Sequence, residues 1–218
     1  DALGFVSDVP SSGTYIDISS GTGHTCAIDA DGSVACWGGS DHYGEVSGAP
    51  NGVFISLHSG RQHTCALTSS GSASCWGRDN EGQISNKPNT GFVDFSSGNY
   101  HSCGLTSGNL VQCWGYDTYG QVSDTPIGDQ FDSIISGANH TCGSTISGAV
   151  TCWGNSVVAS ETPSEAFEML ASGADHMCGL TASGTVTCWG SDADGQVSDT
   201  PINANFSFIT ANQNSTCG

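Results

Sequence analysis

The chain has 218 residues, of which 31 are glycine and only 11% are charged. Three basic residues stand against 21 acidic ones, so the formal net charge is −18. A chain this acidic repels phosphate backbones and anionic lipid, and it contains no apolar run near the roughly 18 residues of a membrane span, so we expect neither nucleic acid binding nor membrane insertion.

The first predicted elements form one unit. Residues 15–21 (YIDISSG) alternate apolar and polar side chains, which predicts a β-strand. Residues 23–38 (GHTCAIDADGSVACWG) read as a hairpin with a turn at 29–33. Residues 41–50 (DHYGEVSGAP) then predict a turn and a short fourth strand that proline ends. Residues 1–10 align with the tail of such a unit, and residues 192–201 are another copy of that tail.

The hairpin occurs five times and begins a sixth time. The later copies lie at 61–77, 100–115, 139–154 and 175–190, and the sixth starts before Cys217. The spacing of 36–39 residues between first cysteines indicates an array of one supersecondary unit. Each unit is too small to fold alone, so we expect one domain, residues 1–218, that is a fragment of a longer chain.

The rest of the unit repeats as well. Apolar strands are predicted before each hairpin at 53–60, 92–98, 131–137, 167–173 and 206–212, and the tail recurs at 79–88 and 117–126. The predicted fold is therefore all-β, a β-propeller of four-stranded antiparallel blades with about five full repeats and partial end repeats. An open β-solenoid is the alternative. Two further segments stand out. Residues 155–162 are irregular because the fourth copy is shorter and lacks Gly-Gln, and residues 164–170 have a helix-like composition although their second half aligns with strands.

The cysteines are predicted to form local disulfides. Nine residues separate the two cysteines of each hairpin, unlike the close pairs of zinc or redox sites. If Cys26 faces Cys36, then Ile28 faces Val34 in register, at a separation that a disulfide can span. Reduced cysteines in a cytosolic protein are the alternative. The predicted pairs are Cys26–Cys36, Cys65–Cys75, Cys103–Cys113, Cys142–Cys152 and Cys178–Cys188, and Cys217 has no mate in this chain.

Such bridges persist in oxidising compartments, so we expect an extracellular or cell-surface protein, with the periplasm as another possibility. Apolar residues 4–6 and 206–210 are expected to contact each other, another copy or a continuation of the chain, since an unpaired terminal half-repeat exposes a sheet edge.

The pattern H-[ST]-C-x-L…G-x-V-x-C-W-G-x-[DN]-x-x-G-Q closely resembles the repeat of the regulator of chromosome condensation family. The resemblance covers nearly the whole chain and implies a propeller, commonly of seven blades, that binds protein partners. Its relatives include a nucleotide exchange factor for a small GTPase and a β-lactamase inhibitor, and the paired cysteines are typical of secreted-looking members. Exchange activity does not carry over, because its contact residues have no match here. The matching residues are His24, Gly32, Trp37, Gly38 and Gly44 in the first copy, and His63, Gly71, Trp76, Gly77, Gly82 and Gln83 in the second.

Several residue types could carry chemistry, and each has a structural interpretation that we favour. The repeated histidines could be a metal array, but propeller symmetry keeps them apart, so we expect each to bond backbone inside its own blade. The repeated tryptophans could stack sugars, yet packing between blades explains them. The pairs Asp29/Asp31 and Asp192/Asp194 could bind calcium, but Asx turns explain them. These residues are His24, His63, His101, His140, His176, Trp37, Trp76, Trp114, Trp153 and Trp189.

Asn139, Asn205 and Asn214 begin glycosylation sequons, which arise by chance in a chain rich in serine and asparagine. Neither a catalytic constellation nor a phosphate clamp is present in the sequence, so we expect no enzyme and no cofactor. The favoured function is a secreted, protein-binding propeller. A structural subunit or segment of an extracellular fibre or surface layer is the near-equal alternative, and an enzyme with its site on a further domain is the third.

Overall fold

The computed structural model describes residues 13–201 and 204–218, and nearly all of its regular structure is β-strand. The first sheet contains β1 (Tyr15–Ser20), β2 (Thr25–Asp29) and β3 (Val34–Trp37), paired antiparallel in the order β1-β2-β3. The same order recurs in four more sheets, β4 (Ser56–Ser59) to β6, β7 to β9, β10 to β12 and β13 to β15, and a two-stranded sheet follows, β16 (Thr210–Ala211) with β17 (Thr216–Cys217). The other strands are β5 (His63–Leu67), β6 (Ala73–Gly77), β7 (Phe92–Ser97), β8 (His101–Thr106), β9 (Val111–Gly115), β10 (Ser133–Ser136), β11 (His140–Ser144), β12 (Val150–Gly154), β13 (Met169–Ser172), β14 (His176–Leu180) and β15 (Val186–Gly190).

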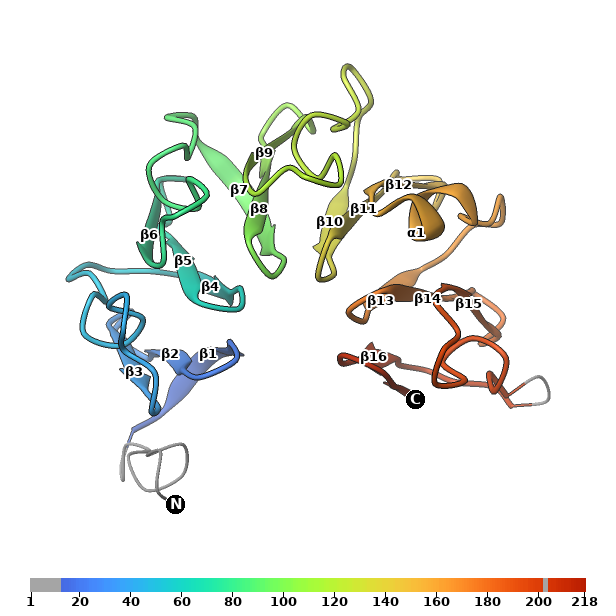
Figure 1. Cartoon of the computed structure of the whole chain (residues 1–218), viewed down its shortest axis with the longest axis horizontal. Helices are drawn as coiled ribbons and strands as arrows, with labels where there is room; N and C mark the ends of the chain where they lie inside the picture. Colours follow the sequence, from blue (N-terminus) through green and yellow to red (C-terminus); the bar gives the residue numbers. More distant parts are fainter. Residues whose placement is uncertain (1–12, 202–203) are drawn as a thin grey trace.

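The sheets stand side by side as blades in an open arc, with β1, β4, β10, β13 and β16 on the inner side and β3, β6 and β15 outside (Figure 1). The apolar core lies between neighbouring blades. In the first interface Cys26 and Ile28 of one repeat pack with Phe54, Leu57 and Trp76 of the next. The same arrangement recurs at the later interfaces, so each repeat completes its core only with a neighbour.

The predicted fourth strand is wrong, because the segment after each β3-type strand is a compact turn and each blade has three strands. In the first repeat an Asp41 carboxylate oxygen accepts hydrogen bonds from the backbone N–H groups of Val46 and Ser47 at 2.8 and 2.9 Å. These two bonds lower the pKa of the Asp41 carboxyl. The buried Glu45 carboxylate accepts from the N–H of Tyr43 at 2.8 Å. Side chains thus satisfy the donors that a strand would offer to a neighbour.

The irregular fourth copy contains the one helix of the described residues, α1 (Ser156–Ser160), within the segment 155–162 that the sequence marks as irregular. The side chain of Asn155 accepts from the N–H of Val157 at 3.1 Å, which caps the helix. Val158 is fully buried and packs with Trp189, so α1 fills the place that the turn occupies elsewhere. Residues 164–166 are not helical, and Met169–Ser172 is a strand, as the alignment predicts.

The contact expected between residues 4–6 and 206–210 involves residues 4–6, which lie outside the described residues. Of the second segment, Ile209 is buried in a cluster with Cys178 and Leu180, and Phe206 packs beside it, while Phe208 is 56% exposed. No helix in residues 13–201 or 204–218 is long and apolar enough to span a bilayer.

The turn bonds predict the effect of Asp117→Ala. Asp117 accepts from the N–H groups of Val122 and Ser123 at 2.8 and 2.9 Å. We expect the free energy of unfolding in urea to fall by about 1–2 kcal/mol, because two backbone donors lose their partner. The matched variant Asp129→Ala removes an exposed carboxylate and should change it by less than about 0.5 kcal/mol. Equal effects of the two variants would refute this role of the aspartate.

Candidate functional site

Five disulfides join the second and third strands of successive sheets. Cys26–Cys36 links β2 to β3 with Cα atoms 4.1 Å apart, and the other four have Cα separations of 4.0 Å. In each hairpin the two cysteines face each other directly in the antiparallel register. The other pairs are Cys65–Cys75, Cys103–Cys113, Cys142–Cys152 and Cys178–Cys188, and Cys217 is a free, exposed thiol in the structure.

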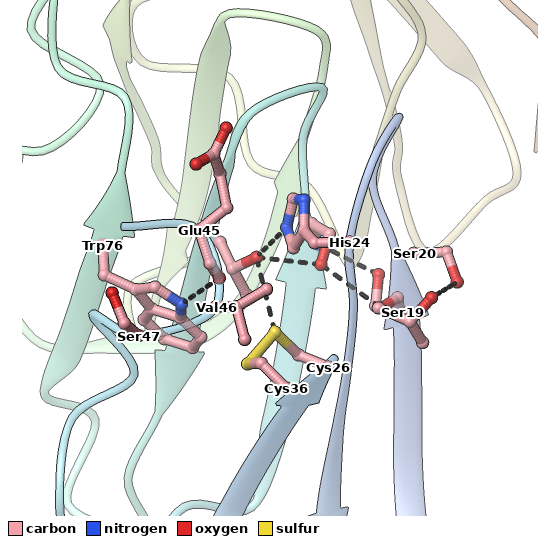
Figure 2. The surroundings of a disulfide bond; sticks show 12 residues. Ser19, Ser20, His24, Cys26, Cys36, Glu45, Val46, Ser47 and Trp76 are labelled. Atoms are coloured by element: carbon pink, nitrogen blue, oxygen red, sulfur yellow. Dashed lines mark hydrogen bonds between the residues drawn. A yellow bond between two sulfur atoms is a disulfide. The ribbon is translucent and has the colours of Figure 1, made fainter. Parts of the chain in front are cut away.

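The repeated histidines connect neighbouring repeats, so the expectation that each bonds backbone within its own blade is wrong. Nε2 of His24 lies 2.8 Å from the hydroxyl oxygen of Thr64, the residue that follows the next histidine in the chain (Figure 2). His63, His101 and His176 make the same contact at 2.9 Å with Ser102, Thr141 and Thr216. Each histidine is buried, so its ring nitrogen needs a polar partner, and a hydroxyl of the next repeat supplies one.

The fourth histidine shows what happens when the hydroxyl is missing. Met177 occupies the position that Thr64 holds in the second repeat, and it offers no hydroxyl. His140 bonds instead to the hydroxyl of Ser172 at 3.1 Å, which also lies in the next repeat. The inter-repeat bond therefore survives a change in the residue that supplies it.

The hydrogen-bond network favours one tautomer of His24 and His140. The Ser59 hydroxyl donates its proton to the carbonyl of Ser19, so the Thr64 hydroxyl donates to Ser59 and accepts from Nε2–H of His24. Ser172, which donates to the carbonyl of Gly173, likewise accepts from His140. Nδ1 then carries a lone pair, and in all five rings this buried atom lacks a hydrogen-bond partner within the described residues.

Burial keeps these imidazoles neutral. Loss of solvent lowers the pKa of His63 to about 4, and that of His101 and His140 to about 3, with a smaller contribution from neighbouring histidines. The pKa of His24 and His176 is also lowered by burial. The histidines therefore act as neutral hydrogen-bond donors at physiological pH.

The turns between the first and second strands form a continuous backbone ladder on the inner side of the arc. The N–H of Thr22 donates to the carbonyl of Arg61 at 3.0 Å, and Arg61 donates to Asn99 at 3.0 Å. The same bond continues from Asn99 to Ala138, from Ala138 to Ala174 and from Ala174 to Gln213. These turns line a polar hollow of about 510 Å³ whose only charged side chain is that of Arg61.

Glycine is required where these turns meet the histidines. A Cβ on Gly21 would lie 2.3 Å from Cε1 of His24 and 2.5 Å from the carbonyl oxygen of Gly60, which is too close for any side chain. Gly60, Gly98, Gly137 and Gly173 face the same obstacle. Each histidine ring thus lies directly against a glycine of its own turn.

The tryptophans fill the space between repeats, as predicted. Trp114 is buried and stacks on Phe92 with ring centroids 5.6 Å apart, and Trp189 stacks on Phe167 at the same distance. Nε1–H of Trp76 donates to the carbonyl of Glu45 at 3.0 Å, which Figure 2 shows beside the first disulfide. A buried tryptophan leaves no ring face for a sugar, so these residues serve packing.

The remaining candidates are the aspartates considered as calcium ligands and the asparagines of the glycosylation sequons. An Asp29 carboxylate oxygen accepts from the N–H groups of Asp31 and Ser33, which is an Asx turn, and the side chain of Asp194 accepts from Asn214. In the described part of the chain no three His, Cys, Asp or Glu side chains gather as metal ligands would. Asn205 and Asn214 are exposed, whereas Asn139 is half-buried and its side-chain oxygen accepts from Gln121.

One face of the arc combines a fixed backbone with side chains that vary. The turn after the first strand and the loop after the third strand lie at the same end of each sheet, because the strands alternate in direction. A backbone bond joins them, for example from the N–H of Arg78 to the carbonyl of Gln62 at 2.7 Å and from Tyr116 to Tyr100 at 2.8 Å. No two repeats carry the same pair of residues at these positions, and the pairs are Gly23/Ser40, Gln62/Arg78, Tyr100/Tyr116, Asn139/Asn155 and Asp175/Ser191. We refer to this surface as the loop face.

The chain is thus a repeat protein whose blades are held by histidine, tryptophan and backbone contacts and which presents a loop face of variable composition. The model of the regulator of chromosome condensation (RCC1) repeat matches residues 15–45, 54–83, 92–121 and 170–196, more than half of the chain. The protein belongs to this family. The matched segments omit the fourth copy, where α1 replaces the usual turn.

Solved structures share this fold. The ectodomain of the receptor kinase CR4 from Physcomitrella patens is 28% identical with a TM-score of 0.80, and the alignment covers 96% of this chain and 59% of that one. The CRINKLY WD40 ectodomain of the Arabidopsis thaliana receptor kinase ACR4 is 24% identical, with a TM-score of 0.79, over 99% of this chain and 80% of that one. Prp20p from Saccharomyces cerevisiae, described with its binding to Gsp1p and histones, is 16% identical with a TM-score of 0.73, over 93% and 67%. The chain therefore spans about three fifths of the CR4 ectodomain. No protein of curated function matches by sequence.

The buried histidines predict that the protein loses stability in mild acid. In the unfolded chain each histidine binds a proton near pH 6.5, whereas His63, His101 and His140 resist protonation until about pH 4 or 3. The unfolded state therefore binds more protons below pH 6.5, and stability falls as the pH decreases. We expect the free energy of unfolding in urea to fall between about pH 6 and pH 4, with a slope that approaches about 4 kcal/mol per pH unit for the three residues together. A stability that is constant from pH 7 to pH 4.5 would contradict the buried neutral state.

The disulfides predict a second result. The double variant Cys103→Ser/Cys113→Ser opens a loop of about ten residues and should lower the free energy of unfolding by about 3 kcal/mol in the chain-entropy account. Peptide mapping of the unreduced wild-type protein should yield five links, each within one hairpin. Cys217→Ser is the control and should leave stability unchanged, because this thiol is exposed and unpaired. Links between different repeats would overturn the assignment.

Proposed function

We propose that the protein is an extracellular binding module that recognises a protein partner through its loop face. The observation that carries the proposal is the contrast between an invariant frame and a variable face. The buried histidine, the tryptophan and the glycine three residues before the histidine recur in all five complete repeats. The paired positions of the loop face change from glycine and serine to arginine, tyrosine, asparagine and aspartate. A rigid scaffold that presents diverse loops is the usual architecture of a recognition surface.

The extracellular setting is supported by the chemistry and by the comparisons. Five disulfides per 218 residues suit an oxidising compartment. The CR4 and ACR4 structures are ectodomains of receptor kinases, and Prp20p is described as binding the proteins Gsp1p and histones. A net charge of −18 disfavours nucleic acid as the partner. The loop face offers binding side chains rather than a nucleophile paired with a base, so the proposal is a binding protein and not an enzyme.

Site-specific photo-crosslinking tests the proposal. A photoreactive amino acid at Tyr119, on the loop face, should capture a discrete protein from the extracellular fraction of the source organism. The same group at Ile127 or Ile146, which are 100% and 92% exposed in other loops, should capture none. Capture from the control positions alone would exclude the loop face as the binding surface.

Self-assembly into a fibre or surface layer is the second candidate, and one observation favours it. A hollow of about 280 Å³ is lined by Phe206, Ile209 and Thr216 of the last repeat, and Cys217, whose free thiol is exposed, is the next residue of β17. A chain joined through these residues would show a solution mass that rises with concentration and falls with reductant. A mass equal to one chain under both conditions would exclude assembly of this chain and favour the binding module.

A further inference from the structure

Four of the five tyrosines and two of the three basic residues of the chain lie together on the loop face. This tyrosine–arginine cluster lies in loops and turns of the first three repeats. Other repeats carry different residues there, for example Ala138 and Ala174 at the position of Arg61 and Asn139 at that of Tyr100. The repeat pattern does not require it, and the fold is held elsewhere by histidine, tryptophan and backbone contacts. Its members are Tyr43, Arg61, Arg78, Tyr100, Tyr116 and Tyr119.

The cluster is continuous across the three repeats. The guanidinium carbon of Arg78 lies 4.6 Å from the ring centroid of Tyr100 and 5.8 Å from that of Tyr43. Arg61 lies over the same Tyr100 ring at 5.6 Å. Tyr116 contacts Tyr100 edge-on with centroids 6.2 Å apart, and Tyr119 contacts Tyr116 in the same way at 6.3 Å. Each side chain therefore holds its neighbour in place, and little conformational entropy remains to be lost on binding.

The two arginines have unused capacity for hydrogen bonds. Nη1–H of Arg78 donates to the side chain of Gln62 at 3.0 Å, but its Nε–H is buried without a partner. The ion pair of Arg78 with Glu81 is 3.8 Å long and the Glu81 carboxylate is 40% exposed, so it is weak. Arg61 is exposed and makes no ion pair within the described residues. On a chain with a charge of −18, this cluster is the place where a carboxylate finds two cations together.

Tyrosine and arginine are the residue types that dominate the energy of protein interfaces, and here two rings remain accessible. Tyr43 and Tyr119 are 43% and 52% exposed at the outer ends of the cluster, while Tyr100 and Tyr116 are half-buried beneath them. The accessible rings can bury an apolar side chain of a partner, while the arginines between them bind a charge.

We propose that the tyrosine–arginine cluster is the docking surface for a protein segment that presents one carboxylate beside an apolar or aromatic side chain. This inference rests on the proposed function and gives it a location and a ligand chemistry. A polyanion would be repelled by the rest of the chain, so a single carboxylate on an otherwise neutral or basic surface fits best. A sugar fits less well, because the guanidinium groups of Arg61 and Arg78 already lie over the Tyr100 ring on which it would stack.

Selection from a phage-displayed library of random 12-residue peptides on the disulfide-bonded chain tests the inference. The enriched peptides should carry an aspartate or glutamate next to an apolar residue. A synthetic copy of the best peptide should lose at least tenfold in affinity for the Arg61→Ser and Tyr119→Ser variants, and the same amount when its acidic residue becomes the amide. Both substituted side chains are exposed, and thermal melts of the two variants should match that of the wild type.

Matched controls separate the cluster from general surface effects. Lys87→Ser removes the third cation, and Ile146→Ser removes an apolar side chain that is 92% exposed, so both should leave peptide affinity within twofold. Peptides that bind Arg61→Ser and Tyr119→Ser as tightly as the wild type would overturn the inference. If such a peptide still reduced crosslinking of the partner at the loop face, the proposed function would remain supported. Enrichment of no peptide, together with no crosslink at Tyr119, would overturn both. A sugar that binds through the cluster, detected on a glycan array, would refute the assignment to a protein segment.

Discussion

The structure depends on one constraint, which is that no repeat can satisfy its buried polar groups by itself. Each interface contains a neutral histidine that donates to a hydroxyl of the next repeat, and each inner turn donates a backbone N–H to the turn beyond it. A buried donor without a partner costs about 1–3 kcal/mol, so separating two repeats is expensive even before their apolar contacts are lost. The disulfides fix each hairpin, and these inter-repeat bonds fix the hairpins relative to one another.

Because the contacts between repeats lie in the interior and in the backbone, the residues of the loop face can vary between repeats. The bond between the two loops is made by backbone atoms, so it does not depend on which side chains occupy those positions. Tyr100 and Tyr116 can therefore stand where Asn139 and Asn155 stand in the next repeat, and the backbone bond remains 2.8 Å long in both. The same scaffold can present different chemistry in different directions around the arc.

The sequence predicted the repeat, the strands of each hairpin, the packing role of the tryptophans and the family, because these follow from local spacing and alternating polarity. It failed where the outcome depends on which side chains take up the polar groups of the backbone or of another repeat. The fourth strand was predicted from an apolar residue before proline, but the Asp41 and Glu45 side chains take up the backbone donors and fold a turn. The histidine partners were missed although a signal exists, since a threonine or serine follows His24, His63, His101 and His140 and a glycine precedes each by three residues. The tyrosine–arginine cluster joins residues up to 76 positions apart, and no local pattern marks it.

The state of the histidines tests this account most directly. Nitrogen-15 NMR of the imidazole rings distinguishes the neutral Nε2–H form from the neutral Nδ1–H form and from the imidazolium. The account predicts that His63, His101 and His140 remain neutral with the proton on Nε2 as the pH is lowered from 7 to 5, while the protein stays folded. Rings that titrate near pH 6.5 would contradict their burial at the interfaces between repeats, and a proton on Nδ1 would show that the inter-repeat hydrogen bonds run in the opposite direction to the one assigned.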